Sequence, residues 1–159
     1  MPRAWLWRSA AVALVGAGQA SALHAQRVTE VGVHATLLAA DPAVWVGGVY
    51  GAVRPSSRVR VAALVGAGMS DDAFAWRSEL LWQFLLTPRA RRGVGAYGGG
   101  GIAVTGGSET EGFVVLILGL EARPGAGSGW AFEAGVGGGL RLSASYRWRR
   151  VRGQYAPGG

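Results

Sequence analysis

The sequence predicts an all-β fold, an eight-stranded antiparallel up-and-down transmembrane β-barrel that follows a cleaved signal peptide. Segments in which apolar and polar residues alternate recur along the chain after residue 27. This period of two is typical of a strand whose two faces meet different environments. The connections between the segments are alternately acidic and basic. Aromatic residues recur near the segment ends, as they do at the two interfaces of a membrane.

The composition limits what kind of protein this is. A chain of 159 residues is enough for one domain, and the absence of cysteine from the sequence excludes disulfides and thiolate metal sites. A formal net charge of +7 raises nucleic acid as a partner. All 16 basic residues are arginine, however, and they are scattered along a chain of positive mean hydropathy. We therefore expect no nucleic-acid partner.

The N-terminus has the features of a secretory signal peptide. Arg3 and Arg8 flank the start of a small, apolar run that is too short to span a bilayer, which takes about 20 residues. Small residues allow cleavage after Ala22 or after Ala25. The predicted boundaries are 1–25 for the signal peptide, 26–150 for the barrel and 151–159 for a short C-terminal tail.

Eight strands are expected in the mature chain, most of them as long as the roughly 9–11 residues of a transmembrane strand. They are Val28–Ala39, Val44–Arg54, Arg58–Gly68, Phe74–Leu86, Val94–Thr105, Phe113–Arg123, Trp130–Gly137 and Leu140–Arg149.

The first four strands differ in how clearly they alternate. In the first strand, Val31 and Val33 face away from Glu30. In the third, Val61 faces away from Arg60. The second strand is too rich in glycine to assign its faces. The fourth alternates most strongly, with Phe74, Trp76, Leu80, Trp82, Phe84 and Leu86 on one face and Arg77, Glu79 and Gln83 on the other.

Among the last four strands, the eighth carries the clearest pattern. The fifth is again rich in glycine, and the sixth contains the longest apolar run of the mature chain, from Phe113 to Leu120. The eighth alternates from Leu140 onward between apolar residues and arginine or serine, and its apolar face ends in Tyr146 and Trp148. One face of this strand is therefore expected to run through lipid and to stop at a headgroup boundary.

The connections segregate by charge. The odd-numbered hairpins contain acids and no arginine, except for the last, which holds only glycine; the acids are Asp41, Asp71, Asp72, Glu109 and Glu111. The even-numbered hairpins contain arginine, at Arg54, Arg58, Arg89, Arg91, Arg92 and Arg123. The two ends of an up-and-down meander therefore carry opposite charges.

Aromatic residues predict two girdles. The ten residues from Phe74 to Phe84 cover about 33 Å along a strand. With a tilt of about 40°, this is roughly 25 Å along the membrane normal, the height of the apolar band of such barrels. One predicted girdle contains Trp45, Phe74, Trp76 and Phe113, and the other Trp82, Phe84, Trp130, Phe132, Tyr146 and Trp148.

The charges on the inward face are expected to form a network, because buried charges must be paired. Such a network would fill the narrow interior of an eight-stranded barrel. Its predicted members are Glu30, Arg60, Arg77, Glu79, Glu121, Arg123, Glu133, Arg141 and Arg147. Hairpin registers and closure predict the pairs Arg60 with Glu79, Glu133 with Arg141, and Glu30 with Arg147.

Three other patterns carry no site. The segment Gly93–Gly98 matches a dinucleotide-binding fingerprint, but three further glycines follow it where that motif needs a helix, so no cofactor is expected. His34 could form a hydrolase triad with Glu30 and a serine of the eighth strand, yet these residues share the inward face and match no local motif. The acidic hairpins could bind divalent cations, but we expect solvated loop tips and no metal site.

With these segments in place, residues 27–149 resemble the small eight-stranded outer-membrane barrels of the OmpA and OmpX type. The resemblance rests on the signal peptide, the strand count and the aromatic-ended segment Leu140–Trp148, which is similar to the last strand by which such proteins are recognised for assembly. It implies the outer membrane of a Gram-negative cell as location, with both termini on the periplasmic side. The implied surroundings and partners are outer-membrane lipid, lipopolysaccharide and the assembly machinery, and a monomer is expected. The chain departs from the family in its short outward loops and in the tail after the aromatic strand.

Three function classes follow. The favoured expectation is a non-enzymatic integral outer-membrane protein with a structural or interaction role and a lumen filled by side chains. The alternative is a soluble, periplasmic, lipocalin-like barrel with an apolar ligand inside, which would place Trp76, Leu80 and Trp82 in the interior. A lipid A-modifying barrel enzyme that uses His34 is a third class.

Overall fold

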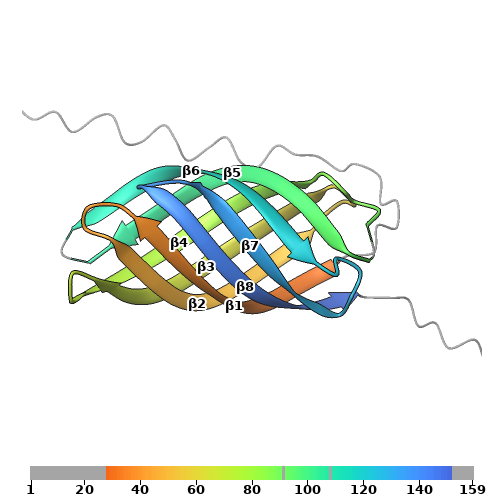
Figure 1. Ribbon diagram of the computed structural model, residues 1–159, viewed down its shortest axis with the longest axis horizontal. Coiled ribbons are helices and arrows are strands. Elements are labelled where there is room, and N and C mark those ends of the chain that lie inside the picture. The colour runs from red at the N-terminus through yellow and green to blue at the C-terminus, as the bar shows by residue number, and fades with distance from the viewer. Residues whose placement is uncertain (1–27, 91, 108, 152–159) are drawn as a thin grey trace, which may run out of the picture.

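The computed structural model describes residues 28–90, 92–107 and 109–151. Within these residues lie the eight expected strands (Figure 1), with bounds close to those predicted: β1 (Val28–Ala39), β2 (Val44–Arg54), β3 (Val59–Ser70), β4 (Ala73–Leu85), β5 (Val94–Gly106), β6 (Thr110–Ala122), β7 (Ser128–Val136) and β8 (Leu140–Val151). The predicted signal peptide, Arg91 and the tail from residue 152 onward lie outside the described residues.

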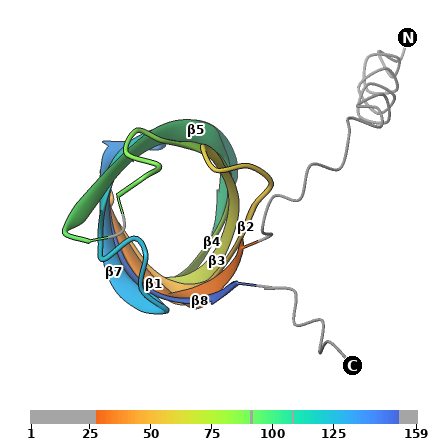
Figure 2. The same cartoon turned by 90° about the vertical axis from the view of Figure 1, so that its right-hand side faces the viewer.

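The strands form one sheet that closes on itself. Each strand pairs antiparallel with the next, and β8 pairs with β1, from Val28 opposite Val151 to Ala39 opposite Leu140. The end view shows the resulting ring (Figure 2). Closure pairs the backbone groups that an open sheet would leave exposed at its edges. The described part of the chain contains no helix that is both long and apolar enough to cross a membrane.

A tight turn fixes the register between β3 and β4. Asp71 and Asp72 form this turn with φ angles of 47° and 62°, as type I′ hairpins require at both central positions. The turn places Arg60 opposite Gln83, and Glu79 opposite Leu64. The expected pairing of Arg60 with Glu79 is therefore wrong, because it needs a hairpin centred closer to the N-terminus than this turn is.

A turn of two glycines fixes the register between β7 and β8. Gly138 and Gly139 have φ angles of 80° and 131°, which only glycine adopts without strain. As a result, Glu133 lies opposite Ser143, and Arg141 lies opposite Gly135. Glu133 and Arg141 are thus diagonal neighbours instead of direct cross-strand partners.

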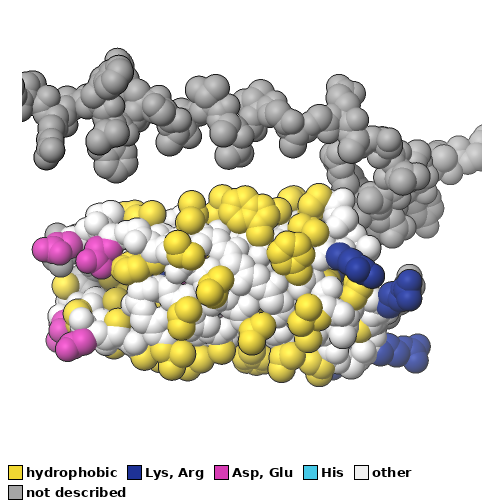
Figure 3. All heavy atoms as spheres, turned by 90° about the horizontal axis from the view of Figure 1, so that it is seen from above, with side chains coloured by type: hydrophobic (Ala, Val, Ile, Leu, Met, Phe, Trp, Pro, Cys, Tyr) yellow, Lys and Arg dark blue, Asp and Glu magenta, His cyan; other side chains and the backbone are white. Residues whose placement is uncertain are grey.

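The two faces of the barrel wall differ in chemistry. On β4, Trp82 is 45% exposed and Leu80 is 37% exposed, whereas Arg77 is only 2% exposed. Figure 3 shows apolar side chains in a band between two charged ends. This arrangement is the reverse of that in a soluble barrel and matches a wall that faces lipid outside and polar side chains inside.

The lumen also contains a small apolar core that was not predicted from the sequence. Its members lie on β2 to β6 and are all buried: Tyr50, Ala52, Ala62, Leu64, Leu81, Tyr97, Ala103, Val115 and Ile117. Tyr97 lies opposite Gly119 on β6, and a Cβ atom at Gly119 would overlap the Tyr97 ring. A glycine on the wall therefore gives the aromatic ring its room.

Phe113 does not belong to an outer girdle, so that assignment is wrong. It occupies the same face of β6 as the buried residues Val115 and Ile117, and its ring lies 6.0 Å from the Arg77 guanidinium carbon inside the barrel. The run from Phe113 to Leu120 is apolar on both faces, so the sequence gives no alternation from which to choose.

Arginine substitutions at two depths along β4 would test whether its outward face crosses a bilayer. Leu80 lies in the middle of this strand, and Leu86 follows its end. Leu80→Arg is expected to lower the free energy of unfolding from lipid vesicles by about 2–4 kcal/mol, and Leu86→Arg by about 0–1 kcal/mol. Reversible urea unfolding followed by tryptophan fluorescence measures both. Equal costs at the two positions would mean that the face of β4 does not cross a bilayer at these depths.

Candidate functional site

The lumen holds one continuous network of ion pairs. Four glutamates and six arginines take part, which leaves an excess of two positive charges. The glutamates are Glu30, Glu79, Glu121 and Glu133, from β1, β4, β6 and β7; the arginines are Arg54, Arg60, Arg77, Arg141, Arg147 and Arg149, from β2, β3, β4 and β8.

Glu30 and Glu121 form the half of the network nearest the chain termini. Arg60 lies between them, with Nη1 2.8 Å from Glu121 Oε2 and 3.5 Å from Glu30 Oε2. Arg54 reaches Glu30 at 2.6 Å. Arg149 contacts both carboxylates, at 3.4 Å and 3.3 Å. Arg54 and Arg149 lie toward the barrel mouth, so this half is closed by paired guanidinium groups.

Glu79 and Glu133 form the other half. Glu79 accepts a hydrogen bond from Arg77 Nε at 2.6 Å, and its other oxygen lies 2.8 Å from Arg141 Nη2. Arg141 also bonds Glu133 at 2.9 Å, and Arg147 bonds the second oxygen of Glu133 at 2.9 Å. Arg147 lies 3.9 Å from Glu121 as well, so it connects the two halves.

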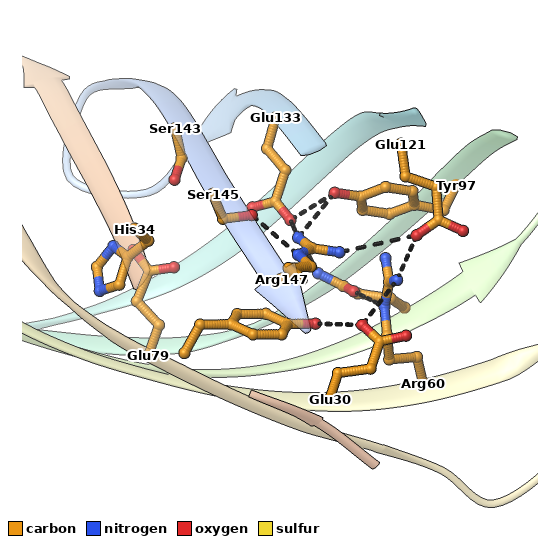
Figure 4. Close-up of polar contacts among 12 residues, drawn as sticks. Glu30, His34, Arg60, Glu79, Tyr97, Glu121, Glu133, Ser143, Ser145 and Arg147 are labelled. Atoms are coloured by element: carbon orange, nitrogen blue, oxygen red, sulfur yellow. Dashed lines mark hydrogen bonds and ion pairs between the residues drawn. The ribbon is translucent and has the colours of Figure 1, made fainter. Parts of the chain in front are cut away.

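Two tyrosines, Tyr50 and Tyr97, pack against the arginines of the network, and Figure 4 shows Tyr97 beside Arg147. The Tyr97 hydroxyl donates to Glu133 at 2.8 Å, and the Tyr50 hydroxyl donates to Glu30 at 3.4 Å. The guanidinium carbons of Arg60 and Arg147 lie 4.3 Å from the ring centroids of Tyr97 and Tyr50, respectively. In a desolvated site, cation–π attraction adds to the stabilisation that Arg60 and Arg147 receive from their carboxylate partners.

Eight of the nine residues predicted for this network lie in the lumen, and one prediction is wrong. Arg123 is exposed in the turn after β6, with a φ of 50°. Only its carbonyl meets the network, where it accepts a hydrogen bond from Arg149 at 3.1 Å. Strand β6 ends at Ala122, so the alternation of inward and outward side chains does not continue to Arg123.

The predicted ion pairs agree less well with the structure than the predicted list of network residues does. Of the expected pairs, Glu133 and Arg141 are in contact. Among the described residues, Glu30 forms ion pairs with Arg54, Arg60 and Arg149, and none with Arg147. Five participants were not predicted as members of the network: Arg54, Arg149, Gln83, Tyr50 and Tyr97. Arg54, Gln83 and Arg149 have the inward parity of their strands, which is the signal that could have identified them.

His34 does not form a catalytic triad. Its ring nitrogens lie 3.2 Å from Thr36 Oγ1 and 3.4 Å from the Val65 carbonyl oxygen. Ser143 is bonded to Thr36 instead, and Glu30 belongs to the ion-pair network. Within the described residues, no group of three or more His, Cys, Asp or Glu side chains is arranged to hold a metal ion.

The glycine fingerprint of the sequence lies on a strand. Gly95 to Gly98 belong to β5, and no helix begins there to present its N-terminus to a phosphate. This segment therefore lacks the geometry of a dinucleotide site.

The outward aromatic residues lie toward both ends of the apolar band. Trp45, Phe74 and Trp76 are exposed toward one end. Toward the end at which β1 begins are Trp82, Phe84, Trp130, Phe132, Tyr146 and Trp148, an aromatic belt on β4, β7 and β8. Within this belt, Tyr146 makes edge contacts with Trp130 and Trp148, at centroid distances of 5.2 Å and 5.1 Å.

The two rims carry opposite charges, and Figure 3 shows acidic side chains at one end and arginine side chains at the other. The acidic rim consists of the exposed residues Asp41, Asp71, Asp72, Glu109 and Glu111. The arginine rim consists of the exposed residues Arg58, Arg89, Arg92, Arg123 and Arg150.

The overall shape of the chain is similar to known structures, although its sequence is not. No model of a protein family and no curated protein sequence matches the chain. The N-terminal β-barrel domain of OprF from Pseudomonas aeruginosa superposes with a TM-score of 0.65 at 12% identity, over 79% of this chain and 98% of that domain. Neisserial surface protein A superposes with a TM-score of 0.52 at 10% identity, over 77% of this chain and 96% of its own. The chain therefore has the fold of the small eight-stranded outer-membrane β-barrels, as its resemblance to the OmpA and OmpX type predicts.

Proposed function

We propose that this chain is an integral outer-membrane β-barrel that acts in the cell envelope through its surfaces, in a structural or interaction role and not as an enzyme. The observation that carries this proposal is the inverted distribution of side chains. Large apolar residues cover the outside of the wall, and charged residues are buried within it. A wall of this kind is stable where its outside meets lipid.

The lumen argues against a ligand-binding soluble barrel. A lipocalin-like protein needs an apolar interior with room for a ligand. Here Arg60, Leu81 and Gln83 are completely buried by their neighbours inside the barrel. These buried side chains support an interior occupied by the protein itself, with the apolar surface on the outside.

The positions of polar side chains likewise argue against an enzyme acting on lipid. Such an enzyme has to present its catalytic groups to the bilayer. His34, Ser143 and Ser145 are buried on the inward face, and their hydrogen bonds are directed to other lumen groups and to the wall backbone.

For the orientation, we propose that the arginine rim is periplasmic and the acidic rim extracellular. β1 begins and β8 ends at the arginine rim, and the family resemblance implies that both ends of the chain are periplasmic. On this proposal the barrel is a monomer that is inserted by the outer-membrane assembly machinery and surrounded by lipopolysaccharide and phospholipid.

Surface labelling tests the location and the orientation together. An epitope inserted between Asp71 and Asp72 is expected to bind antibody on intact Gram-negative cells, and one inserted after Ala90 only after the outer membrane is permeabilised. The same membranes should yield a band whose gel mobility changes on boiling, as a folded barrel does. Labelling at Ala90 alone on intact cells would reverse the orientation, and a soluble, heat-insensitive product would contradict the membrane proposal.

Removal of one lumen carboxylate is expected to be costly. Glu133→Ala leaves Arg141 and Arg147 without a shared partner, and loss of one member of a buried pair typically costs about 3–5 kcal/mol. Urea unfolding in detergent micelles measures this loss. Glu111→Ala, at the exposed acidic rim, is the control and should change the stability by no more than about 0.5 kcal/mol. A similar, small effect at both positions would mean that water enters the lumen around Glu133.

The filled lumen also predicts that the protein conducts ions poorly. Planar-bilayer recording of the purified chain should give no steady, large conductance, because buried side chains, Arg60, Leu81 and Tyr97 among them, occupy the lumen. A stable open level that persists across preparations would show that these side chains line a pore.

A further inference from the structure

The arginine rim differs from the arginines of the lumen in having no counter-charge. Within the described residues, none of its five members, Arg58, Arg89, Arg92, Arg123 and Arg150, forms an ion pair. The two arginines at the mouth of the barrel, Arg54 and Arg149, are by contrast paired with Glu30 and Glu121. The positive charge of the rim is therefore available to a partner outside the barrel.

These arginines surround the whole circumference of the barrel. Arg58 belongs to the turn between β2 and β3, Arg89 and Arg92 to the turn between β4 and β5, and Arg123 to the turn between β6 and β7. Arg150 lies near the end of β8. Every hairpin at this rim and the last strand thus contribute a guanidinium group, which suits a partner that itself surrounds the barrel.

The depth of the rim matches that of lipid phosphates. Arg150 follows Trp148 on the outward face of β8, about 7 Å further along the strand. The aromatic belt at this end places Trp148 at the membrane interface, and the headgroup layer extends about 5–7 Å beyond the hydrocarbon core. The guanidinium group of Arg150 therefore lies level with the headgroups, where phosphate oxygens are its natural bidentate acceptors. The other four arginines belong to the turns at the same rim.

We propose that the arginine rim binds the phosphate groups of anionic phospholipids in the leaflet that it meets. This inference rests on the proposed membrane function and adds a lipid preference at one end of the barrel. The five carboxylates of the acidic rim repel the same lipids, so the preference belongs to the arginine rim alone.

Quenching of tryptophan by brominated lipid measures this preference. The chain has seven tryptophans, and replacing Trp5, Trp7, Trp45 and Trp76 by Phe leaves three reporters at the arginine-rim end, namely Trp82, Trp130 and Trp148. The full chain is refolded into vesicles of brominated phosphatidylcholine mixed with unlabelled phosphatidylglycerol, or with unlabelled phosphatidylcholine as reference. A preference for the anionic lipid displaces brominated lipid and restores fluorescence.

At low ionic strength the anionic lipid should be favoured by about fivefold at a lipid site beside one arginine. The preference should fall to near unity when the ionic strength reaches about 1 M, where the Debye length is about 3 Å. A variant in which the five rim arginines are replaced by Gln should show no preference at either ionic strength. The matched control neutralises the five residues of the acidic rim, as Asn or Gln, and should keep or increase the preference.

The outcomes separate this inference from the function on which it rests. Heat-dependent gel mobility of each variant establishes first that a membrane barrel has formed, and its absence in the unmodified chain would overturn the proposed function. A folded chain that shows no preference, or a preference that survives the arginine replacements, overturns the lipid inference alone. If inorganic phosphate abolishes the preference at constant ionic strength, the rim binds free anions and the inference is also wrong. Because the salt dependence of the three-tryptophan reporter chain with its arginine rim intact is measured independently, a rim variant that fails to fold does not remove the test.

Discussion

The structure depends on ten charged side chains, eight of them buried, in a lumen that is only wide enough to be filled by side chains. Charges in such a place are tolerated only in pairs, and here four carboxylates are shared among six guanidinium groups. The sharing extends across the barrel. Arg141 on β8 contacts Glu79 on β4, and Arg54 on β2 contacts Glu121 on β6, so each pair joins strands that lie four positions apart in the ring. Because backbone pairing connects only neighbouring strands, these ion pairs are among the contacts that join opposite walls directly.

An excess of arginine in a closed lumen needs acceptors other than carboxylates. The Tyr50 and Tyr97 rings provide two, beneath Arg147 and Arg60. Backbone carbonyls at the ends of the barrel provide others, since Arg77 donates to Gly137 and Arg149 donates to Arg123 and Ala126. The turns thereby become part of the network, because their carbonyl oxygens satisfy guanidinium groups of the lumen. Glycine makes this packing possible where a ring lies against the wall, as Tyr97 does against Gly119.

The sequence predicted the strands and their faces far better than the contacts inside. Alternation in β4 and β8 identified which side chains point inward, since that depends only on the period of two of a strand. The cross-strand partners depend on turn geometry as well, and the left-handed Asp71-Asp72 turn moved Glu79 away from Arg60. Contacts across the ring, such as that of Arg141 with Glu79, depend on the diameter of the barrel and on long side-chain conformations, which no hairpin rule contains. Phe113 was misplaced for another reason: a strand that is apolar on both faces carries no periodic signal.

The charges of the rims are not demanded by the fold. The type I′ turn between β3 and β4 requires positive φ at two positions, which Asn-Gly would meet without charge, yet this chain has two aspartates there. The turn between β4 and β5 likewise needs no guanidinium group to connect its strands, and among the described residues neither Arg89 nor Arg92 forms an ion pair. Like charges gathered on one rim repel one another and slightly destabilise the folded chain. The fold neither needs these rim charges nor is stabilised by them, so their explanation lies outside the barrel. We therefore assign the arginine rim to an anionic lipid surface, whereas the lumen network stabilises the barrel itself.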